Sequence, residues 1–344
     1  MNDKILMEDI VNIVEKGRID FERFRNTSFL ITGATGLIGY NIIKTLIYAN
    51  EKMHLNMEII ALVRNLDKAK SMYNQSDKIT FVVSDITGFT EYDEDIDYII
   101  HTASMTSSKE FVDMPVETID IALRGTNNLL NIAKEKKVKG FVYTSSMEIY
   151  GAPDSDEKID EHHNTDLDTM LARSSYPESK RMCETMCAAY ALEYGLNAKV
   201  ARLTQTFGPG VQYDDGRVFA EFARCAVEKK DIVLHTKGET KRCYLYTADA
   251  VRALLLILLY GEQGEAYNVA NEKTYCTIYD MANLVANECV NSEINVDVIP
   301  EDISRYGYAK TLHMNLDTSK IQKLGWIPVV DLKGSFERMI TSWQ

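Results

Sequence analysis

Tyr176 and Lys180 lie four residues apart in "SSYPESK", a spacing that places both side chains on one face of a helix. A free tyrosine has a pKa of about 10, so its phenol is a poor base at neutral pH. A nearby ammonium stabilises the phenolate and lowers that pKa. The pair is therefore a candidate for removing a proton from a substrate hydroxyl, although two ordinary polar residues of a helix show the same spacing.

A pair of serines precedes this helix. Ser145 and Ser146 end the apolar run "GFVYTSS" about 30 residues before Tyr176. If that run is a strand of a parallel sheet, both serines lie at its carboxyl end, where ligands bind in such sheets. A serine hydroxyl, Tyr176 and Lys180 would together take a hydroxyl proton while hydride leaves the adjoining carbon.

The elements that must position these residues alternate along the first half of the chain. Short, continuously apolar runs indicate buried strands, and helical patterns fill most of the intervals between them. This pattern predicts an α/β fold, a Rossmann-type doubly wound parallel sheet with a smaller C-terminal substrate lobe. The expected strands are 28–32, 57–63, 79–83, 97–101, 140–145 and 198–203, and the clearest helices are 38–50, 116–137 and 176–194.

The regular alternation ends near residue 206, before the Gly/Pro-rich segment "FGPGVQYDDG". We expect a helical leader at 1–27, a dinucleotide-binding domain at 28–205, and a mainly substrate-binding lobe at 206–344. Some segments of that lobe are expected to return to the first domain.

A glycine pattern joins the first expected strand to the first helix in "FLITGATGLIG". Gly33, Gly36 and Gly39 allow a tight turn and let backbone amides approach a pyrophosphate, which the helix N-terminus also favours. A plain strand–turn–helix connection is the alternative, but the position after the first strand favours dinucleotide binding. The expected cofactor contacts in this turn are Gly33, Thr35, Gly36, Leu37, Ile38 and Gly39.

The choice between NAD and NADP depends on the end of the second strand. Arg64 stands there, where NAD-binding chains usually carry an acid for the adenosine ribose. A cation can instead meet the 2′-phosphate of NADP, so the sequence leans weakly to NADP, and a solvated arginine is the alternative. Asp85 and Ile86 follow the third strand and are expected near the adenine, although Asp85 also suits a turn.

Composition excludes several partner classes. The 344-residue chain has a net charge of −13, so neither nucleic acid nor an anionic membrane is an expected partner. The most apolar run, "ALLLILLY" at 253–260, is too short to cross a bilayer and predicts a buried helix. Six scattered cysteines without a metal-type spacing indicate reduced thiols and a cytoplasmic location.

Taken together, these motifs resemble an extended short-chain dehydrogenase/reductase of the nucleotide-sugar epimerase/dehydratase family, nearest in appearance to UDP-glucuronate decarboxylases. The resemblance runs from about residue 28 to the end and implies a tightly bound NAD or NADP and a 4-keto sugar intermediate. The segments that carry it are "GATGLIG", "SDI", "HTAS", "TSSMEIYG", "YPESK", "RLTQTFGPG", "DGRVF", "KRCYLYTADAVRALL", "AYNVA" and "LDTSKIQKLGW".

The resemblance implies a role for each matching residue. Ser146 takes the place of the catalytic Ser/Thr, Tyr176 that of the base, and Lys180 that of its partner, which also reaches the nicotinamide ribose. Ala103 is implied to contact the cofactor through its backbone, which we prefer to a general-base role for His101.

Glu148 bears on which reaction follows the ketone. Dehydratase and decarboxylase relatives carry an acid here. Dehydratases place an Asp before it and uronate decarboxylases often a Ser, so Met147 departs from both. "SKRMCETMC" and "DGRVFAEF" resemble decarboxylases more closely. The alternative is that Glu148 only orders its loop.

Arg217 and Arg242 match positions that grip the substrate nucleotide or its phosphates, which suits the geometry of guanidinium groups. Gln205 replaces a usual substrate-binding Asn, and Ala122 replaces another Asn, so substrate placement is expected to differ from well-known relatives. His162 and His163 lie in an acidic loop at 154–168 that we interpret as a solvated lid rather than a metal site.

The leading hypothesis is an enzyme that modifies a nucleotide-diphosphate sugar, decarboxylase-like or an epimerase or dehydratase. An NADPH-dependent carbonyl reductase with exchangeable cofactor and a non-catalytic dinucleotide-binding protein are the alternatives. The resemblance also implies a homodimer through a four-helix bundle that includes the Tyr/Lys helix. The apolar residues of 182–194 permit this, but they would also suit packing against the chain's own core.

Overall fold

The structure is a computed structural model that describes residues 3–74, 78–163, 166–289, 293–300 and 311–344. Within these residues a seven-stranded sheet has the order β10-β6-β5-β4-β1-β2-β3, and its neighbouring strands all run parallel. The strand order reverses between β1 and β4, and ligands bind at such a switch point in open α/β sheets. The strands are β1 Ser28–Thr32, β2 Glu58–Val63, β3 Ile79–Val83, β4 Tyr98–His101, β5 Gly140–Ser146, β6 Ala198–Leu203 and β10 Ala266–Val269.

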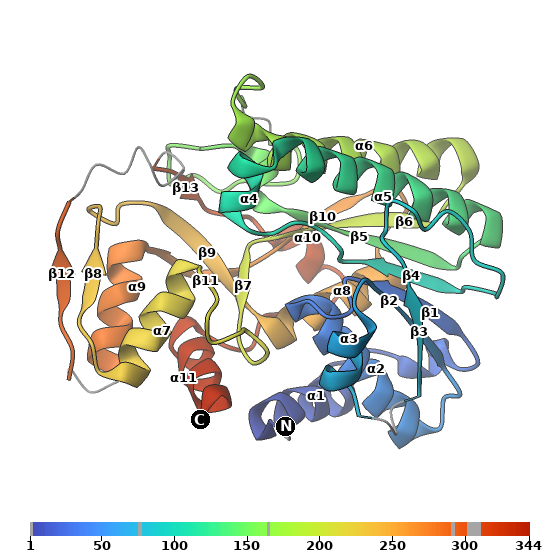
Figure 1. Ribbon diagram of the computed structural model, residues 1–344, viewed down its shortest axis with the longest axis horizontal. Coiled ribbons are helices and arrows are strands. Elements are labelled where there is room, and N and C mark those ends of the chain that lie inside the picture. The colour runs from blue at the N-terminus through green and yellow to red at the C-terminus, as the bar shows by residue number, and fades with distance from the viewer. Residues whose placement is uncertain (1–2, 75–77, 164–165, 290–292, 301–310) are drawn as a thin grey trace.

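Helices cover both faces of this sheet (Figure 1). On one face, α5 (Pro115–Lys136) packs beside α6 (Ser175–Tyr194). On the other face, α2 (Leu37–Met53) packs against α8 (Thr247–Tyr260). Two short helices, α3 (Leu66–Met72) and α4 (Ser108–Asp113), belong to the connections between strands. The predicted Rossmann-type doubly wound sheet is confirmed.

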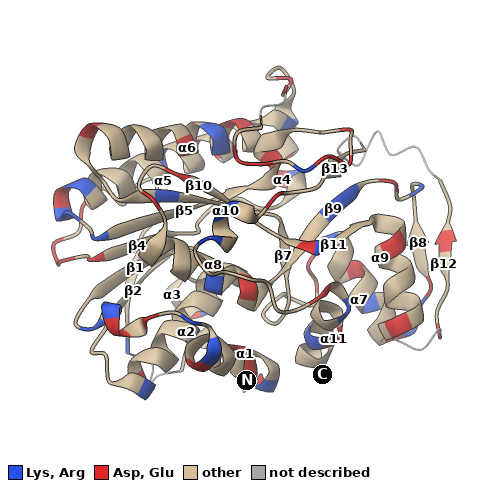
Figure 2. Ribbon diagram, turned by 180° about the vertical axis from the view of Figure 1, so that it is seen from behind, with Lys and Arg blue, Asp and Glu red and all other residues tan. Residues whose placement is uncertain are grey.

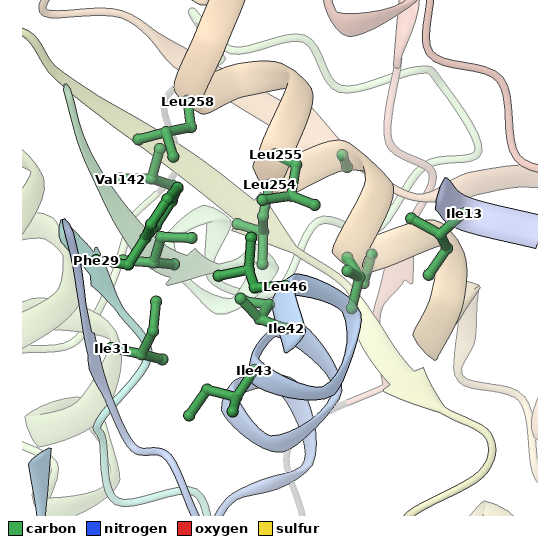
Figure 3. Packing of buried hydrophobic residues seen from close by; sticks show 14 of the residues in the cluster. Ile13, Phe29, Ile31, Ile42, Ile43, Leu46, Val142, Leu254, Leu255 and Leu258 are labelled. Atoms are coloured by element: carbon green, nitrogen blue, oxygen red, sulfur yellow. The ribbon is translucent and has the colours of Figure 1, made fainter. Parts of the chain in front are cut away.

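The core between the sheet, α2 and α8 is built mainly from branched aliphatic side chains, with aromatic rings such as that of Phe29 among them (Figure 3). The predicted buried helix at 253–260 is buried from 253 to 258, whereas Tyr260 at the end of α8 is 37% exposed. Burying one such leucine contributes about 1.5–3 kcal/mol, so this layer fixes the sheet firmly. The labelled residues are Leu254, Leu255 and Leu258 of α8, Ile42, Ile43 and Leu46 of α2, Phe29 and Ile31 of β1, Val142 of β5, and Ile13 near the N-terminus.

A smaller lobe forms from the second half of the chain (Figure 1). Its core includes Phe207, whose ring centroid lies 4.7 Å from that of Phe219 and 4.9 Å from that of Phe336. The predicted smaller lobe is therefore present, although α8 and β10 return to the large sheet. The lobe contains β7 Gln205–Phe207, β8 Ile232–Leu234, β9 Lys241–Tyr246, β11 Asn271–Thr277, β12 Val296–Val298, β13 His313–Met314, α7 Val218–Glu228, α9 Ile278–Leu284 and α11 Leu332–Trp343.

Both ends of the chain lie near each other (Figure 1). Helix α1 (Lys4–Lys16) packs against α2, α8 and α11. Its Asp9 is 6% exposed and accepts hydrogen bonds from the Tyr246 hydroxyl and from Arg338, the latter at 2.7 Å. The Arg338 Nε also donates to the Tyr246 hydroxyl at 2.9 Å, so one buried polar cluster joins α1, β9 and α11.

Candidate active site

Ser146, Glu148, Tyr176 and Lys180 come together at the carboxyl end of β5. Ser146 is the last residue of that strand, and Glu148 lies in the 3₁₀ turn Met147–Tyr150 that follows it. The Ser146 hydroxyl oxygen accepts a hydrogen bond from the Glu148 amide at 3.2 Å and so caps this turn. Tyr176 and Lys180 occupy the first two turns of α6, which starts at the same edge of the sheet.

Tyr176 is buried, with 9% of its surface exposed. Burial raises the pKa of its phenol, and the negative charge of Glu148 raises it further. A hydrogen bond with Ser146 and the positive charges of Arg173 and Arg217 lower the pKa. The phenolate therefore depends on neighbouring donors and cations for its stability.

Lys180 is even more enclosed, with 3% of its surface exposed. Its Nζ donates to the Thr144 carbonyl at 2.7 Å and lies 5.7 Å from the centroid of the Tyr176 ring. Burial lowers the pKa of the ammonium to about 8. Lys180 is thus still largely protonated at neutral pH and places its positive charge beside the phenol.

Arg173 is a site residue that the sequence reasoning missed. It lies in a short 3₁₀ turn, Ala172–Ser174, directly before α6, and its NH2 group is 2.6 Å from Glu148 Oε2. Its guanidinium carbon lies 4.9 Å from the centroid of the Phe111 ring, which stacks at 4.1 Å on the Tyr176 ring. The signal was its place three residues before Tyr176, in the stretch that drew attention to the site.

Glu148 thus has two contacts in the site, the hydrogen bond from its backbone amide to Ser146 and the ion pair of its carboxylate with Arg173. The Glu148 side chain is 30% exposed and that of Arg173 24%, so both remain accessible from the edge of the sheet. The Arg173 Nε is buried without a hydrogen-bond partner in the described residues. An unpartnered buried donor costs free energy, and a ligand acceptor can remove that cost.

The glycine turn has the shape that a pyrophosphate requires. Gly33 has a φ of +66°, and a Cβ atom there would lie 2.7 Å from the Thr102 hydroxyl oxygen. A Cβ atom on Gly39 would lie 2.4 Å from the Gly33 carbonyl oxygen. Gly36 is the N-cap of α2, so the turn presents the N-terminus of a 17-residue helix at the switch point of the sheet. Thr35, Leu37 and Ile38 lie in the same turn and helix start, so this segment fits a dinucleotide.

Arg64 and Asp85 lie on the neighbouring strand ends. Arg64 is exposed just after β2, and its charge reaches Asp85. Asp85 Oδ1 accepts hydrogen bonds from the Thr87 amide at 2.9 Å and hydroxyl at 2.6 Å, which lower the pKa of this carboxyl. Asp85 therefore does form a turn, while Ile86 is buried and packs close to Gly125 of α5.

His101 is fully enclosed at the end of β4. Its Nδ1 lies 2.9 Å from the Thr32 hydroxyl and its Nε2 3.2 Å from that of Thr126. Burial lowers the pKa of the imidazole to about 3, which keeps the ring neutral and favours a structural role for His101 between the two threonines. The Ala103 amide donates to the Thr32 hydroxyl at 3.2 Å, and Ala103 itself is partly exposed toward the predicted cofactor edge.

The predicted substrate residues come from the smaller lobe. Arg217 pairs with Asp215 at 2.6 Å, and its charge reaches Tyr176. Gln205 on β7 and Arg242 on β9 each have a buried side-chain atom, Oε1 and Nε respectively, without a partner in the described residues. Figure 2 shows the basic segment of β9 to which Arg242 belongs.

The acidic loop predicted as a lid is tied to the C-terminal segment. Residues 164–165 of this loop lie outside the described residues, but the Ile159 amide donates to the Asn315 carbonyl at 2.8 Å. The Asn268 amide donates to Glu161 Oε1 at 2.7 Å. Among the residues with described positions, no group of three His, Cys, Asp or Glu could hold a metal ion. No helix among the described ranges is long and apolar enough to span a bilayer.

Known proteins resemble this chain in sequence and in fold. The chain is 27% identical over 314 residues to UDP-glucuronic acid decarboxylase 6 of Arabidopsis thaliana, covering 90% of this chain and 86% of that one. It is 29% identical over 246 residues to UDP-glucuronic acid decarboxylase 1 of Xenopus tropicalis, which covers 72% of this chain and 56% of that longer one. Several of the curated relatives are thus about twice as long as the part matched here.

Solved structures share the fold. DesIV, a dTDP-glucose 4,6-dehydratase from Streptomyces venezuelae with NAD bound, superposes with a TM-score of 0.77 at 21% identity, covering 92% of this chain and 97% of that one. A family model described as "NAD dependent epimerase/dehydratase family" matches residues 29–270. These similarities confirm three predictions. The chain is an extended short-chain dehydrogenase/reductase, it is an enzyme, and NAD is a cofactor. The chain belongs to the NAD-dependent epimerase/dehydratase family.

Proposed function

We propose that this enzyme decarboxylates a nucleoside-diphosphate uronate through a 4-keto intermediate. The observation that carries the proposal is Arg173, a partly buried cation that Glu148 holds beside Tyr176. If Tyr176 takes the proton of the C4 hydroxyl, the carboxylate on the adjoining C5 lies within the neighbourhood of this guanidinium. Arginine is well suited to receive a carboxylate through two parallel hydrogen bonds.

The chemistry of a uronate explains why these residues suffice. NAD, when bound, supplies the hydride acceptor that turns the C4 alcohol into a ketone. The C6 carboxylate is then β to a carbonyl, and breaking the C5–C6 bond releases CO2 while the electron pair moves into a C4 enolate. A proton delivered to C5, from a site acid or from water, restores the C4 ketone before hydride returns to C4. Ser146 and the phenol of Tyr176 hydrogen-bond the C4 oxygen and stabilise the negative charge that develops on it. Lys180 supplies the cation that helps Tyr176 to exchange its proton.

Water loss is disfavoured by the residue before Glu148. Dehydration needs an acid for the leaving hydroxyl, and Met147 stands where dehydratase relatives place an Asp. Met147 is 4% exposed, and its sulfur lies 3.1 Å from the Thr204 hydroxyl oxygen, which donates its proton to the Cys243 carbonyl. The names of two similar proteins, both UDP-glucuronic acid decarboxylases, support the same branch.

The other end of the substrate would occupy the smaller lobe. Arg217 and Arg242 are assigned to the diphosphate or nucleotide, with Gln205 in place of the usual Asn. The unpartnered Arg242 Nε and Gln205 Oε1 support this assignment, since a ligand would satisfy both. Uridine is the nucleotide proposed, because the curated relatives named above act on UDP-glucuronic acid.

We assign the adenosine end of the cofactor to Asp85, Ile86 and Arg64, and its nicotinamide end to Ala103, Tyr176 and Lys180. Arg64 is exposed and free to meet a 2′-phosphate, so NADP is proposed to bind as well as NAD. Because hydride is returned to the sugar in this reaction, the cofactor is proposed to stay bound through the cycle.

A homodimer in a reducing, cytoplasmic compartment completes the proposal. The outer surfaces of α5 and α6 expose Ile119, Met182 and Leu192, while Cys183 and Cys187 of α6 face the core. Within 182–194, apolar side chains therefore lie both on the exposed side of the helix and on the side that packs against the core. The cysteines are all free, which fits a reducing environment.

The test is a product assay by mass spectrometry on UDP-, dTDP-, GDP- and CDP-sugars, uronates included. UDP-glucuronate is expected to lose CO2, whereas loss of water from a neutral sugar, or an isomer of unchanged mass, would replace this proposal with dehydration or epimerisation. Net reduction that consumes NADPH would support the carbonyl reductase instead. No change with any sugar would leave the non-catalytic dinucleotide-binding protein.

Arg173→Gln tests the carboxylate contact. We expect about a 10²-fold loss of kcat/KM or more with the uronate, because a charge-assisted contact is removed from a partly buried site. Arg124→Gln is the matched control, since Arg124 makes an exposed ion pair with Asp120 on α5 and lies 62% exposed. Equal activity of both variants would contradict the role of Arg173.

A further inference from the structure

Tyr143 lies in the middle of β5 and has no role in the site described so far. Its side chain is 1% exposed. The centroid of its ring lies 4.7 Å from Lys180 Nζ and 5.3 Å from the centroid of the His101 ring. The ring therefore lies between the β4 histidine and the α6 lysine.

Lys180 needs stabilising contacts because it is buried. An ammonium has three N–H donors, and the described residues offer Lys180 Nζ one hydrogen-bond acceptor, the Thr144 carbonyl. None of the ion pairs among the described residues includes Lys180, and the face of an aromatic ring carries partial negative charge that attracts a cation. The Tyr143 ring is the nearer of the two rings that face Nζ, at 4.7 Å against 5.7 Å for Tyr176.

The other groups around Lys180 do not replace this contact. Glu184, one turn further along α6, is engaged by Arg202 at 2.7 Å. Cys183 and Cys187 are buried free thiols on the same helix. On the β4 side, burial keeps His101 neutral because it lowers the imidazole pKa to about 3.

We propose that Tyr143 is a positioning residue whose ring face holds the Lys180 ammonium charged and directed toward Tyr176. The inference rests on the proposed function, because it gives Lys180 its purpose. It predicts that the ring is required and that the hydroxyl is not. The Tyr143 hydroxyl instead interacts with the side chain of Cys183.

The test compares Tyr143→Phe, which keeps the ring, with Tyr143→Leu and Tyr143→Met, which remove it. Phe141→Leu is the matched control, since Phe141 is fully buried, belongs to the same core cluster and precedes Tyr143 by two residues on β5. The protein is labelled with ¹³C at lysine Cε, and Lys180 is assigned by the loss of its signal in Lys180→Met. Lys199 serves as an internal reference for a second buried lysine.

We expect the pKa of Lys180 to fall by about 1 unit in Tyr143→Leu and Tyr143→Met, and to stay within a few tenths of a unit in Tyr143→Phe and Phe141→Leu. In the same two variants, the fall of kcat/KM at alkaline pH should begin at a lower pH, because Lys180 loses its proton earlier. An unchanged Lys180 pKa in the ring-less variants, or an equal shift in Phe141→Leu, overturns the inference. The titration needs no substrate, so failure of the proposed reaction in wild type would be recognised separately.

Discussion

Two buried lysines occupy opposite ends of the same sheet, and only one of them lies in the candidate site. Lys180 is 3% exposed and Lys199 1% exposed, and burial lowers the pKa of each to about 8. Each donates to one backbone carbonyl, Lys180 to Thr144 at 2.7 Å and Lys199 to Leu258 at 3.1 Å. Lys180 lies at the carboxyl end of β5, whereas Lys199 lies near the amino end of β6.

The comparison teaches that burial and a lowered pKa do not identify a functional lysine by themselves. Lys180 faces the rings of Tyr143 and Tyr176 at the edge where ligands bind. Lys199 crosses the end of α8, where its Cγ would touch a Cβ atom placed on Gly261. The first lysine should therefore control activity, and the second should affect only stability.

The largest expected effect is that of Lys180→Met. Removing the cation beside Tyr176 leaves a buried phenol whose pKa is already raised, so we expect a loss of kcat of about 10²–10⁴-fold. Product formation from UDP-glucuronate measures it, and the thermal midpoint checks that the variant is folded. A folded Lys180→Met enzyme with wild-type kcat would remove the distinction between the two lysines.

Lys199→Met should raise the stability of the fold and leave activity almost unchanged. Methionine fills a similar volume without a buried charge, so we expect a gain of roughly 1–3 kcal/mol in the free energy of unfolding at pH 7. Denaturant unfolding measures the gain, and kcat should stay within about twofold of wild type. A large loss of activity in this variant would mean that the amino end of the sheet also matters for function.

The pH dependence of stability sharpens the same contrast. The folded-state pKa of Lys199, about 8, is below its ordinary value of 10.5, so the unfolded chain binds the proton more tightly. The destabilising contribution is therefore full below pH 8 and disappears as the pH rises toward 10.5. The stability gap between wild type and Lys199→Met should narrow between pH 8 and pH 10, as measured by urea unfolding, and a constant gap would contradict this account.

The smallest expected effect is that of changing Arg64, an exposed cation that follows the carboxyl end of β2. Arg64→Glu should weaken NADP binding about tenfold and leave NAD binding almost unchanged, because an exposed charge pair contributes little in water. Calorimetric titration of both dinucleotides measures this difference. Equal weakening of both would assign Arg64 to the shared part of the cofactor or to the fold.

Several features of this molecule could be predicted from local sequence patterns. The first six strands of the sheet are short runs rich in apolar residues, and the glycine turn and the Ser146, Tyr176 and Lys180 positions follow from their order after those strands. β10 was not predicted as a strand, because Ala266–Val269 is four residues long and follows a stretch without alternation.

The contacts that were missed join residues far apart in the chain. Arg173 and Glu148 are 25 positions apart, and nothing in either local segment indicates that the 3₁₀ turns bring them together. Tyr143 was read only as part of a strand, because its role depends on where α6 packs. The anchoring of loop 154–168 likewise depends on residues 268 and 313–317.

The buried cluster of Asp9, Tyr246 and Arg338 joins both terminal helices, α1 and α11, to β9. The family model matches residues 29–270, so α1 and α11 lie outside that model, although similar proteins align over as much as 90% of this chain. Cutting the chain to the matched region would strand the Tyr246 hydroxyl in the core and uncover the side of α8 and α2 that α1 shields. The two terminal helices therefore cover and complete a core that the family model does not itself include.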